Sequence, residues 1–218
     1  MSQSPASGMS KVFFSVTMSL DGFIAPERMQ LGVPVDQWLP QWMELQAYVF
    51  DQRFFRENLG LGEGGETGND NRFLEQTYNR TGVSIMGKRM FEGGEQAWPE
   101  DAPFHTPVFV VTSEVREPWV RPGGTTFHFV NDGPESALRQ ARDTAGDRDI
   151  RVAGGGNTIV QFLNAGLVDE FSVAVAPVLL GNGVRLFDGI DPSRLALDIV
   201  DAVPSNKVTH LTYAVRKR

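Results

Sequence analysis

The 218-residue chain contains no cysteine. Disulfide bonds, thiolate nucleophiles and zinc–thiolate sites are therefore excluded. The three histidines, His105, His128 and His210, are scattered and lack the spacing of metal ligands, so we expect no metal site. No stretch approaches the roughly 18 consecutive apolar residues of a membrane span, so we expect no membrane segment.

Positive charge is also scarce, with 20 lysines and arginines against 27 aspartates and glutamates, a net charge of −7. An acidic chain without a basic run is not expected to bind a nucleic-acid backbone. Residues 1–10 are small and polar, with neither the basic nor the apolar segment of a secretion signal. We therefore expect a frayed N-terminus over 1–10, one domain over 11–218 and a cytoplasmic protein.

Strand and helix patterns alternate along most of the chain, which predicts an α/β fold with a mostly parallel sheet covered on both faces. The last two predicted strands have no long helix between them, which predicts an antiparallel C-terminal edge. The glycine-rich stretch 59–71 is interpreted as a long loop, either a lid or disordered. The predicted strands are 11–19, 83–86, 108–112, 126–130, 150–153, 170–178 and 208–216, and the predicted helices are 36–55, 73–81, 134–145 and 157–165, with another opening at 87–91.

Polar or glycine-rich groups follow three of these strands. Gly154, Gly155 and Gly156 join a strand to a helix that begins with Asn157 and Thr158. A helix start free of side chains leaves backbone N–H groups open to a phosphate or diphosphate. Such a bend can equally be a tight turn with nothing bound.

The second strand end is Gly87-Lys88-Arg89, a helix start with two basic residues, and the third is Thr112-Ser113. Taken singly, the charges can be solvated and the hydroxyls can cap a turn. Taken together at one edge of a parallel sheet, they favour a nucleotide site. Two helix starts can bind a diphosphate, while Lys88 and the two hydroxyls can bind a further phosphate. This pattern predicts NADPH rather than NADH as the cofactor.

In this order and spacing, the motifs resemble the dihydrofolate reductase-like superfamily, from about residue 11 to 216. The resemblance is greatest to the reductase (C-terminal) domain of bifunctional riboflavin-biosynthesis enzymes and their stand-alone bacterial relatives. The motifs that carry it are Ser19-Leu20-Asp21-Gly22-Phe23-Ile24-Ala25, Met86-Gly87-Lys88-Arg89-Met90-Phe91-Glu92, Val111-Thr112-Ser113, Gly154-Gly155-Gly156-Asn157-Thr158, Ala165-Gly166-Leu167-Val168-Asp169-Glu170 and Ala176-Pro177-Val178-Leu179-Leu180-Gly181.

The resemblance implies a three-layer fold and hydride transfer from NADPH to a small heterocyclic substrate. It also implies a homodimer formed through sheet edges and C-terminal strands. The residues that it implies for the cofactor are Gly154, Gly155, Gly156, Asn157 and Thr158 at the pyrophosphate, Gly87, Lys88, Arg89, Met90, Thr112 and Ser113 toward the adenosine phosphates, and Thr17, Ile24 and Ala25 at the nicotinamide.

Two departures bear on the substrate. Riboflavin-pathway reductases usually carry a glutamate where this chain has Gly154, and folate reductases carry an acidic residue shortly after a segment like Trp38-Leu39-Pro40, where this chain has Gln41 and Trp42. The first hypothesis is a 5-amino-6-(5-phosphoribosylamino)uracil reductase. Dihydrofolate-type pterin reduction and a non-catalytic nucleotide- or flavin-binding protein remain as alternatives.

The proton donor stays open at this stage. Asp21 is the first candidate, because it follows the first strand beside the expected nicotinamide, although Asp-Gly is also a common turn pair. A bound water is an alternative donor. The candidate substrate residues are Asp36 and Trp42 in the predicted helix, and Asp70 and Arg72 after the glycine-rich loop. Trp42 can equally be a core residue.

Overall fold

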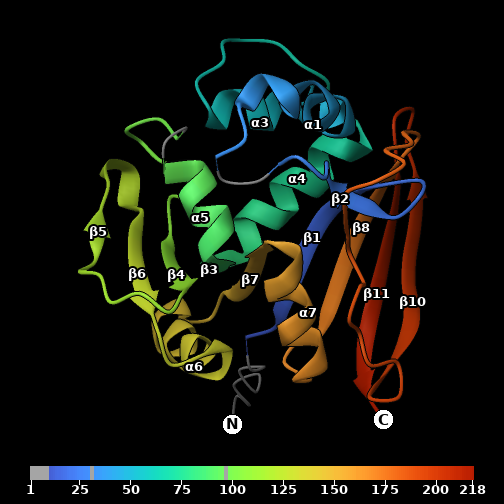
Figure 1. Cartoon of the computed structure of the whole chain (residues 1–218). Helices are drawn as coiled ribbons and strands as arrows, with labels where there is room; N and C mark the ends of the chain where they lie inside the picture. The colour runs from blue at the N-terminus through green and yellow to red at the C-terminus, as the bar shows by residue number, and fades with distance from the viewer. Residues whose placement is uncertain (1–9, 30–31, 96–97) are drawn as a thin grey trace, which may run out of the picture.

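The computed structural model describes residues 10–29, 32–95 and 98–218. Apart from Ser10, the predicted frayed N-terminus therefore lies outside the described residues. The described chain forms a nine-stranded sheet in the order β10-β11-β8-β1-β7-β3-β4-β6-β5 (Figure 1). None of the helices within these ranges has the length and apolar character needed to cross a bilayer.

The middle of the sheet is parallel and both of its edges are antiparallel. β1 pairs in parallel with β7 and β8, β3 with β7 and β4, and β4 with β6. This confirms the mostly parallel sheet and its antiparallel C-terminal edge. The parallel strands are β1 (Val12–Ser19), β3 (Thr81–Gly87), β4 (Pro107–Val111), β6 (Thr126–Val130), β7 (Asp149–Gly154) and β8 (Glu170–Ala176).

Four strands were not predicted from the sequence. β5 (Trp119–Val120) adds an antiparallel strand beside β6, and β10 (Leu195–Pro204) forms the outer C-terminal edge beside β11 (Thr209–Lys217). β2 (Phe23–Ala25) and β9 (Val184–Arg185) pair in a small second sheet. The C-terminal edge is thus two antiparallel strands wide.

Helices cover both faces, which gives the predicted three layers. α6 (Pro134–Ala145) and α7 (Gly156–Asn164) cover one face, where they share a core with Phe14, Ile85 and Ile150. The other face carries α1 (Leu39–Leu45), α2 (Ala47–Phe50), α4 (Asn69–Arg80) and α5 (Lys88–Glu95), while α3 (Arg53–Asn58) packs against α4. Two short 3₁₀ helices, η1 (Val35–Gln37) and η2 (Pro122–Gly124), complete the described elements.

Strand alternation explains how one sheet serves two cores. In β4, Phe109 packs in the core under α6, whereas Val108 and Val110 pack with Phe91 of α5 on the opposite face. All four side chains are at most 3% exposed. A continuous apolar strand is expected where both faces of a parallel sheet are covered.

The predicted single helix over 36–55 is wrong, because the chain turns between short helices. α1 ends at Leu45 and is followed by Gln46 outside the helix, and Gln52 has extended backbone angles between α2 and α3. The turns let aromatic rings pack on one another, with the centroids of Phe50 and Phe55 5.2 Å apart. The free energy gained by burying these rings is larger than that of one continuous helix, although the spacing of apolar residues favours the helix.

The predicted loop over 59–71 is shorter than expected, because α4 already begins at Asn69. It is also attached at its middle. The N–H of Glu66 donates to the carbonyl of Asp51 at 2.8 Å, and the N–H of Arg53 donates to the carbonyl of Glu66 at 3.0 Å. These two bonds tie the loop to the α2–α3 turn.

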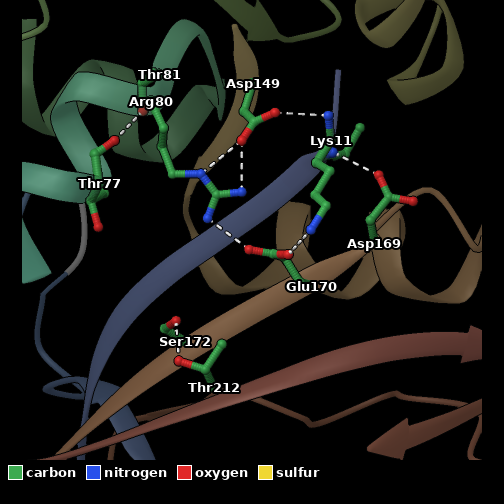
Figure 2. A network of polar contacts seen from close by, with 10 residues as sticks. Lys11, Thr77, Arg80, Thr81, Asp149, Asp169, Glu170, Ser172 and Thr212 are labelled. Atoms are coloured by element: carbon green, nitrogen blue, oxygen red, sulfur yellow. Dashed lines mark hydrogen bonds and ion pairs between the residues drawn. The ribbon is translucent and has the colours of Figure 1, made fainter. Parts of the chain in front are cut away.

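Paired charges join the starts of the parallel strands (Figure 2). The guanidinium of Arg80 lies 2.7 Å from carboxylate oxygens of both Asp149 and Glu170. Lys11 Nζ is 2.7 Å from the other Glu170 oxygen, and the Lys11 N–H donates to Asp149 Oδ1 at 2.9 Å. This network connects the beginnings of β1, β7 and β8 to the end of α4.

Candidate functional site at the carboxyl edge of the sheet

The three strand ends predicted to form a site are neighbours in the structure. β7, β3 and β4 are adjacent, with Met86 opposite Gly154 and Gly87 opposite Val111. Because the strands are parallel, the triple glycine, the Gly87-Lys88 helix start and Thr112 emerge at the same edge. The helices α5 and α7 therefore begin side by side.

Glycines are required where these two helix starts meet. A Cβ added to Gly87 would lie 2.2 Å from Thr158 Oγ1, so a side chain there would force α5 and α7 apart. Gly154 has a φ of +136°, which L-residues rarely adopt, and the Gly154–Gly155 peptide bond is cis. A Cβ on Gly155, by contrast, would have no heavy atom within 4 Å. The bend is thus crowded on one side and open on the other.

The start of α7 has donors to offer a ligand. Gly155 is its N-cap, and among the described residues no side chain caps the helix there. The first N–H groups of a helix have no partner within it and carry the positive end of its dipole. Asn157 is exposed beside them, whereas Thr158 is buried against Gly87. The bend therefore fits an anionic group.

The small β2–β9 sheet lies against the same bend. A Cβ on Gly156 would come within 3.1 Å of Val184 Cγ1 and 3.2 Å of Ile24 Cδ1. The sulfur of Met90 is 3.1 Å from the corresponding position on Gly154. Ile24 and Met90, both predicted near the cofactor, thus lie beside the glycines, and Ala25 lies next to Ile24 in β2.

The side chain of Lys88 makes a contact that the sequence did not predict. Its Nζ lies 2.6 Å from Glu114 Oε1 and 3.6 Å from Glu92 Oε1. The hydrogen bond between Lys88 and Glu114 raises the pKa of the lysine and lowers that of the glutamate, so both are charged near neutral pH. Thr112 lies at the same corner, while Arg89 and Ser113 are exposed.

The carboxylate of Asp21 accepts hydrogen bonds from Ser19, Leu180 and Gly181. Ser19 Oγ donates to its Oδ1 at 2.6 Å, and the N–H groups of Leu180 and Gly181 donate to it at 3.2 and 2.7 Å. The Ser19 hydrogen bond, followed by these backbone bonds, outweighs partial desolvation and lowers the pKa of Asp21. A group that stays ionised holds no proton near neutral pH, so this environment disfavours Asp21 as the acid.

A polar cluster lies on the face of the sheet below α2 and α4. Thr17 Oγ1 donates to Gln46 Oε1 at 2.8 Å and lies 3.3 Å from the Tyr48 hydroxyl. Thr17, Ala174 and His210 form one row across β1, β8 and β11. Burial raises the pKa of Tyr48 to about 12, so its hydroxyl stays protonated.

His210 and Asp70 form a buried pair within this cluster. His210 Nε2 is 2.6 Å from Asp70 Oδ1, and both side chains are at most 6% exposed. The ring of Phe73 stacks on the imidazole at 4.0 Å between centroids. Burial lowers the pKa of His210 even though the hydrogen bond to Asp70 acts to raise it, so the imidazole is neutral near neutral pH.

The four predicted substrate residues are not brought together. Asp70 is buried beside His210, whereas Arg72, on another side of α4, is exposed and contacts Asn69. Asp36 is exposed in η1, and the Trp42 ring packs edge-on against Phe50 at 6.0 Å. Gln46, Tyr48 and His210 are the polar residues near Thr17 that the sequence did not single out.

Comparison with known proteins assigns the chain to a family. Residues 10–211 match the RibD C-terminal domain family. The chain belongs to that family. A 73-residue segment is 41% identical to the uncharacterised protein YyaP of Bacillus subtilis, covering 34% of this chain and 38% of that protein.

Solved structures confirm a dihydrofolate reductase-like fold for this member of the RibD C-terminal domain family. A Shewanella sp. PV-4 protein assigned to riboflavin biosynthesis is 22% identical, with a TM-score of 0.63 over 94% of this chain and 99% of that one. Dihydrofolate reductase of Enterococcus faecalis, complexed with NADP(H), is 14% identical, with a TM-score of 0.54 over 96% and 98% of the two chains.

Proposed function

We propose that the protein is an NADPH-dependent reductase of the riboflavin-biosynthesis type, with 5-amino-6-(5-phosphoribosylamino)uracil as substrate. Membership of the RibD C-terminal domain family supports the reaction class. The observation that carries the cofactor is the open bend at Gly155, which lies at the start of a helix and beside a second helix start. We expect activity near neutral pH, where the proposed charged groups are ionised.

The residues present fit a dinucleotide with an additional phosphate. The N–H groups at the start of α7 would bind its diphosphate. Space is open there, because a Cβ added to Gly155 would have no heavy atom within 4 Å. Lys88, with Thr112 and Ser113 next to it, would bind the adenosine 2′-phosphate. The bound cofactor would supply the hydride. The protein would contribute binding and orientation through these donors.

We assign the substrate side to the cluster around Thr17. The hydroxyl of Thr17 donates to Gln46 Oε1, which leaves the amide N–H groups of Gln46 as donors for a carbonyl of the substrate. The Tyr48 hydroxyl contacts Thr17 at one end of this row, and Asp70 binds His210 at the other. Within the described residues, the side chains of Asp36, Trp42 and Arg72 make no hydrogen bond to this cluster, so we leave them out of the proposed substrate side.

The experiment is a direct assay of purified protein with NADPH. Loss of reduced-nicotinamide absorbance is followed with the pyrimidine substrate and, separately, with dihydrofolate and a flavin. Oxidation with the pyrimidine alone supports the proposal, and oxidation with dihydrofolate alone assigns pterin reduction instead. Tight binding of NADPH with no oxidation by any of the three would favour a nucleotide-binding protein that is not an enzyme.

The Asp21→Asn variant in the same assay tests the proton donor. If Asp21 is structural, the variant has a lower melting temperature because the Leu180 and Gly181 N–H groups lose a charged acceptor, while kcat is largely retained. If Asp21 donates the proton, kcat falls by about 100-fold and its pH dependence changes.

We also propose a homodimer that forms through β10. This outer strand exposes Leu197, Ile199 and Val200 by 42, 75 and 61%, and its outer edge has no partner strand within the described chain. An exposed edge strand with apolar side chains is a template for pairing with another chain. Light scattering coupled to size-exclusion chromatography should give twice the chain mass, and Ile199→Lys should shift it toward the monomer. A monomer at all concentrations contradicts this proposal.

A further inference from the structure

Lys88 and the neighbouring Arg116 are both paired with carboxylates. Lys88 Nζ lies 2.6 Å from Glu114 and 3.6 Å from Glu92. Beside it, Arg116 is held by the two carboxylate oxygens of Glu95 at 2.8 and 3.3 Å. Lys88 and Arg116 are thus paired with three carboxylates, those of Glu92, Glu95 and Glu114. A phosphate that approaches Lys88 meets a carboxylate already bound to it.

Backbone geometry places Glu114 over the lysine. Gly87 and Val111 are paired in register, so the chain leaves β3 at Lys88 and β4 at Thr112 side by side. The N–H of Glu114 donates to Thr112 Oγ1 at 3.1 Å, which turns the chain back toward Lys88. The paired side chains are 38 and 50% exposed, so a ligand in solution can reach the contact.

The neighbouring arginine is engaged elsewhere. In addition to its pair with Glu95, the guanidinium of Arg116 lies over the ring of Phe129 at 4.4 Å and that of Phe91 at 5.1 Å. Moving it would break an ion pair and two cation–π contacts. A phosphate that binds at this corner would therefore displace Glu114 from Lys88, while Arg116 keeps its partners.

We propose that Glu114 is a specificity-determining residue that competes with the 2′-phosphate of the dinucleotide for Lys88. This inference rests on the proposed function, because it assumes that the adenosine end of the cofactor lies at this corner. A carboxylate repels a phosphate but accepts a hydrogen bond from a ribose 2′-hydroxyl. Glu114 thus lowers the preference for NADPH over NADH below the value that Lys88 alone would give.

Glu114→Gln tests this directly, since it removes the charge and keeps the backbone N–H that bonds to Thr112. Isothermal titration calorimetry with NADPH and with NADH gives the two dissociation constants. We expect NADPH to bind about 3- to 10-fold more tightly and NADH to change by less than about twofold, because only the phosphate is repelled. The matched control is Glu117→Gln, which removes the same charge from an exposed position in the same segment and should change neither constant by more than about twofold.

A second comparison separates competition from general charge effects. In a Lys88→Ala background, Glu114→Gln should tighten NADPH binding less than it does in the wild type, because the two residues act on one ligand group. The inference about Glu114 is overturned if Glu114→Gln leaves the ratio of the NADPH and NADH dissociation constants unchanged, or if Glu117→Gln tightens NADPH binding equally. Either result leaves the proposed function standing. A wild-type protein that binds neither nucleotide overturns the proposed function and this inference with it.

Discussion

The parallel strands begin among paired charges and end among glycines. At the amino edge, Arg80 and Lys11 hold the carboxylates of Asp149 and Glu170 at 2.7 to 2.9 Å. At the carboxyl edge, Gly155 faces open space and the first turn of α7 has no side-chain cap among the described residues. One edge satisfies its polar groups internally, and the other leaves donors for a ligand.

This difference separates stability from binding within one sheet. The paired charges at the amino edge stabilise the fold, whereas the unpaired amides at the start of α7 are stabilised when an anion arrives. In open α/β sheets ligands bind at the carboxyl ends of the strands, which matches the open edge here. Substitutions at the two edges should therefore have effects of different kinds.

The largest expected effect is on stability at the amino edge. Arg80→Met removes the cation between Asp149 and Glu170 and leaves two partly buried carboxylates without it. We expect the free energy of unfolding to fall by about 2 kcal/mol, between the values for exposed and buried pairs. Urea denaturation followed by tryptophan fluorescence measures this loss, while NADPH affinity should not change.

Arg216→Met is the matched control for that substitution. Arg216 in β11 also pairs with a carboxylate, that of Asp198 in β10. These two side chains are 64 and 50% exposed, so the pair lies at the surface. We expect no resolvable change in stability there. If both arginine variants lost the same stability, the distinction between the closed edge and the surface would be wrong.

The next effect is on binding at the carboxyl edge. Gly155→Ala places a methyl group where no heavy atom lies within 4 Å, so it should disturb the fold little but occupy the space proposed for the diphosphate. We expect the NADPH dissociation constant to rise at least about tenfold. Calorimetry measures the constant, and a melting curve checks the fold.

Gly93→Ala provides the control, because Gly93 lies within α5 and also has nothing within 4 Å of an added Cβ. An alanine in a helix interior should raise stability by up to about 1 kcal/mol and leave NADPH binding unchanged. Unchanged binding in Gly155→Ala as well would place the diphosphate elsewhere.

A smaller and more selective effect is expected at Lys88. Lys88→Ala should weaken NADPH by about five- to tenfold, since the ammonium would contact the 2′-phosphate, and NADH by less than about twofold. The two dissociation constants measured side by side give the result. Equal weakening of both cofactors would remove the assigned phosphate contact.

The smallest effect is a pH dependence at the amino edge. Burial acts to raise the pKa of Glu170, but hydrogen bonds from Lys11 and Arg80 outweigh it and lower the pKa. A lowered folded-state pKa stabilises the protein above the unfolded value of about 4.3, and this contribution is lost as pH falls through the folded-state pKa.

The difference in the free energy of unfolding between wild type and Glu170→Gln should therefore be largest at about pH 7 and shrink at pH values below about 4. Denaturation at a series of pH values measures it. A difference that stays constant with pH would show that Glu170 acts through packing rather than through its charge.

The sequence predicted those elements whose burial leaves a pattern in the chain. α6 lies over 134–145 and β6 over 126–130, as expected, because each has one or two covered faces that demand apolar side chains. β10 was missed because neither of its faces is buried, so no alternation had to be maintained. The break at Gln46 was missed because local spacing does not reveal which rings will pack together.

The candidate site divides in the same way. The triple glycine and the Gly87-Lys88 start are local motifs, and the parallel order of β7, β3 and β4 brings them together as predicted. The Asp70–His210 pair joins residues 140 positions apart, and no local signal marks such a contact. The partner of Lys88 was hidden for the same reason, since Glu114 is 26 residues away.

The β2–β9 sheet that lies against the triple glycine is a clasp made from two distant parts of the chain. Asp21 accepts hydrogen bonds from Leu180 and Gly181, and Arg185 donates to the Asp21 carbonyl at 3.1 Å. These bonds and the β2–β9 pairing tie the two segments to each other beside the start of α7. Transplanting a loop from a relative would consequently succeed only if both segments were exchanged in the same step.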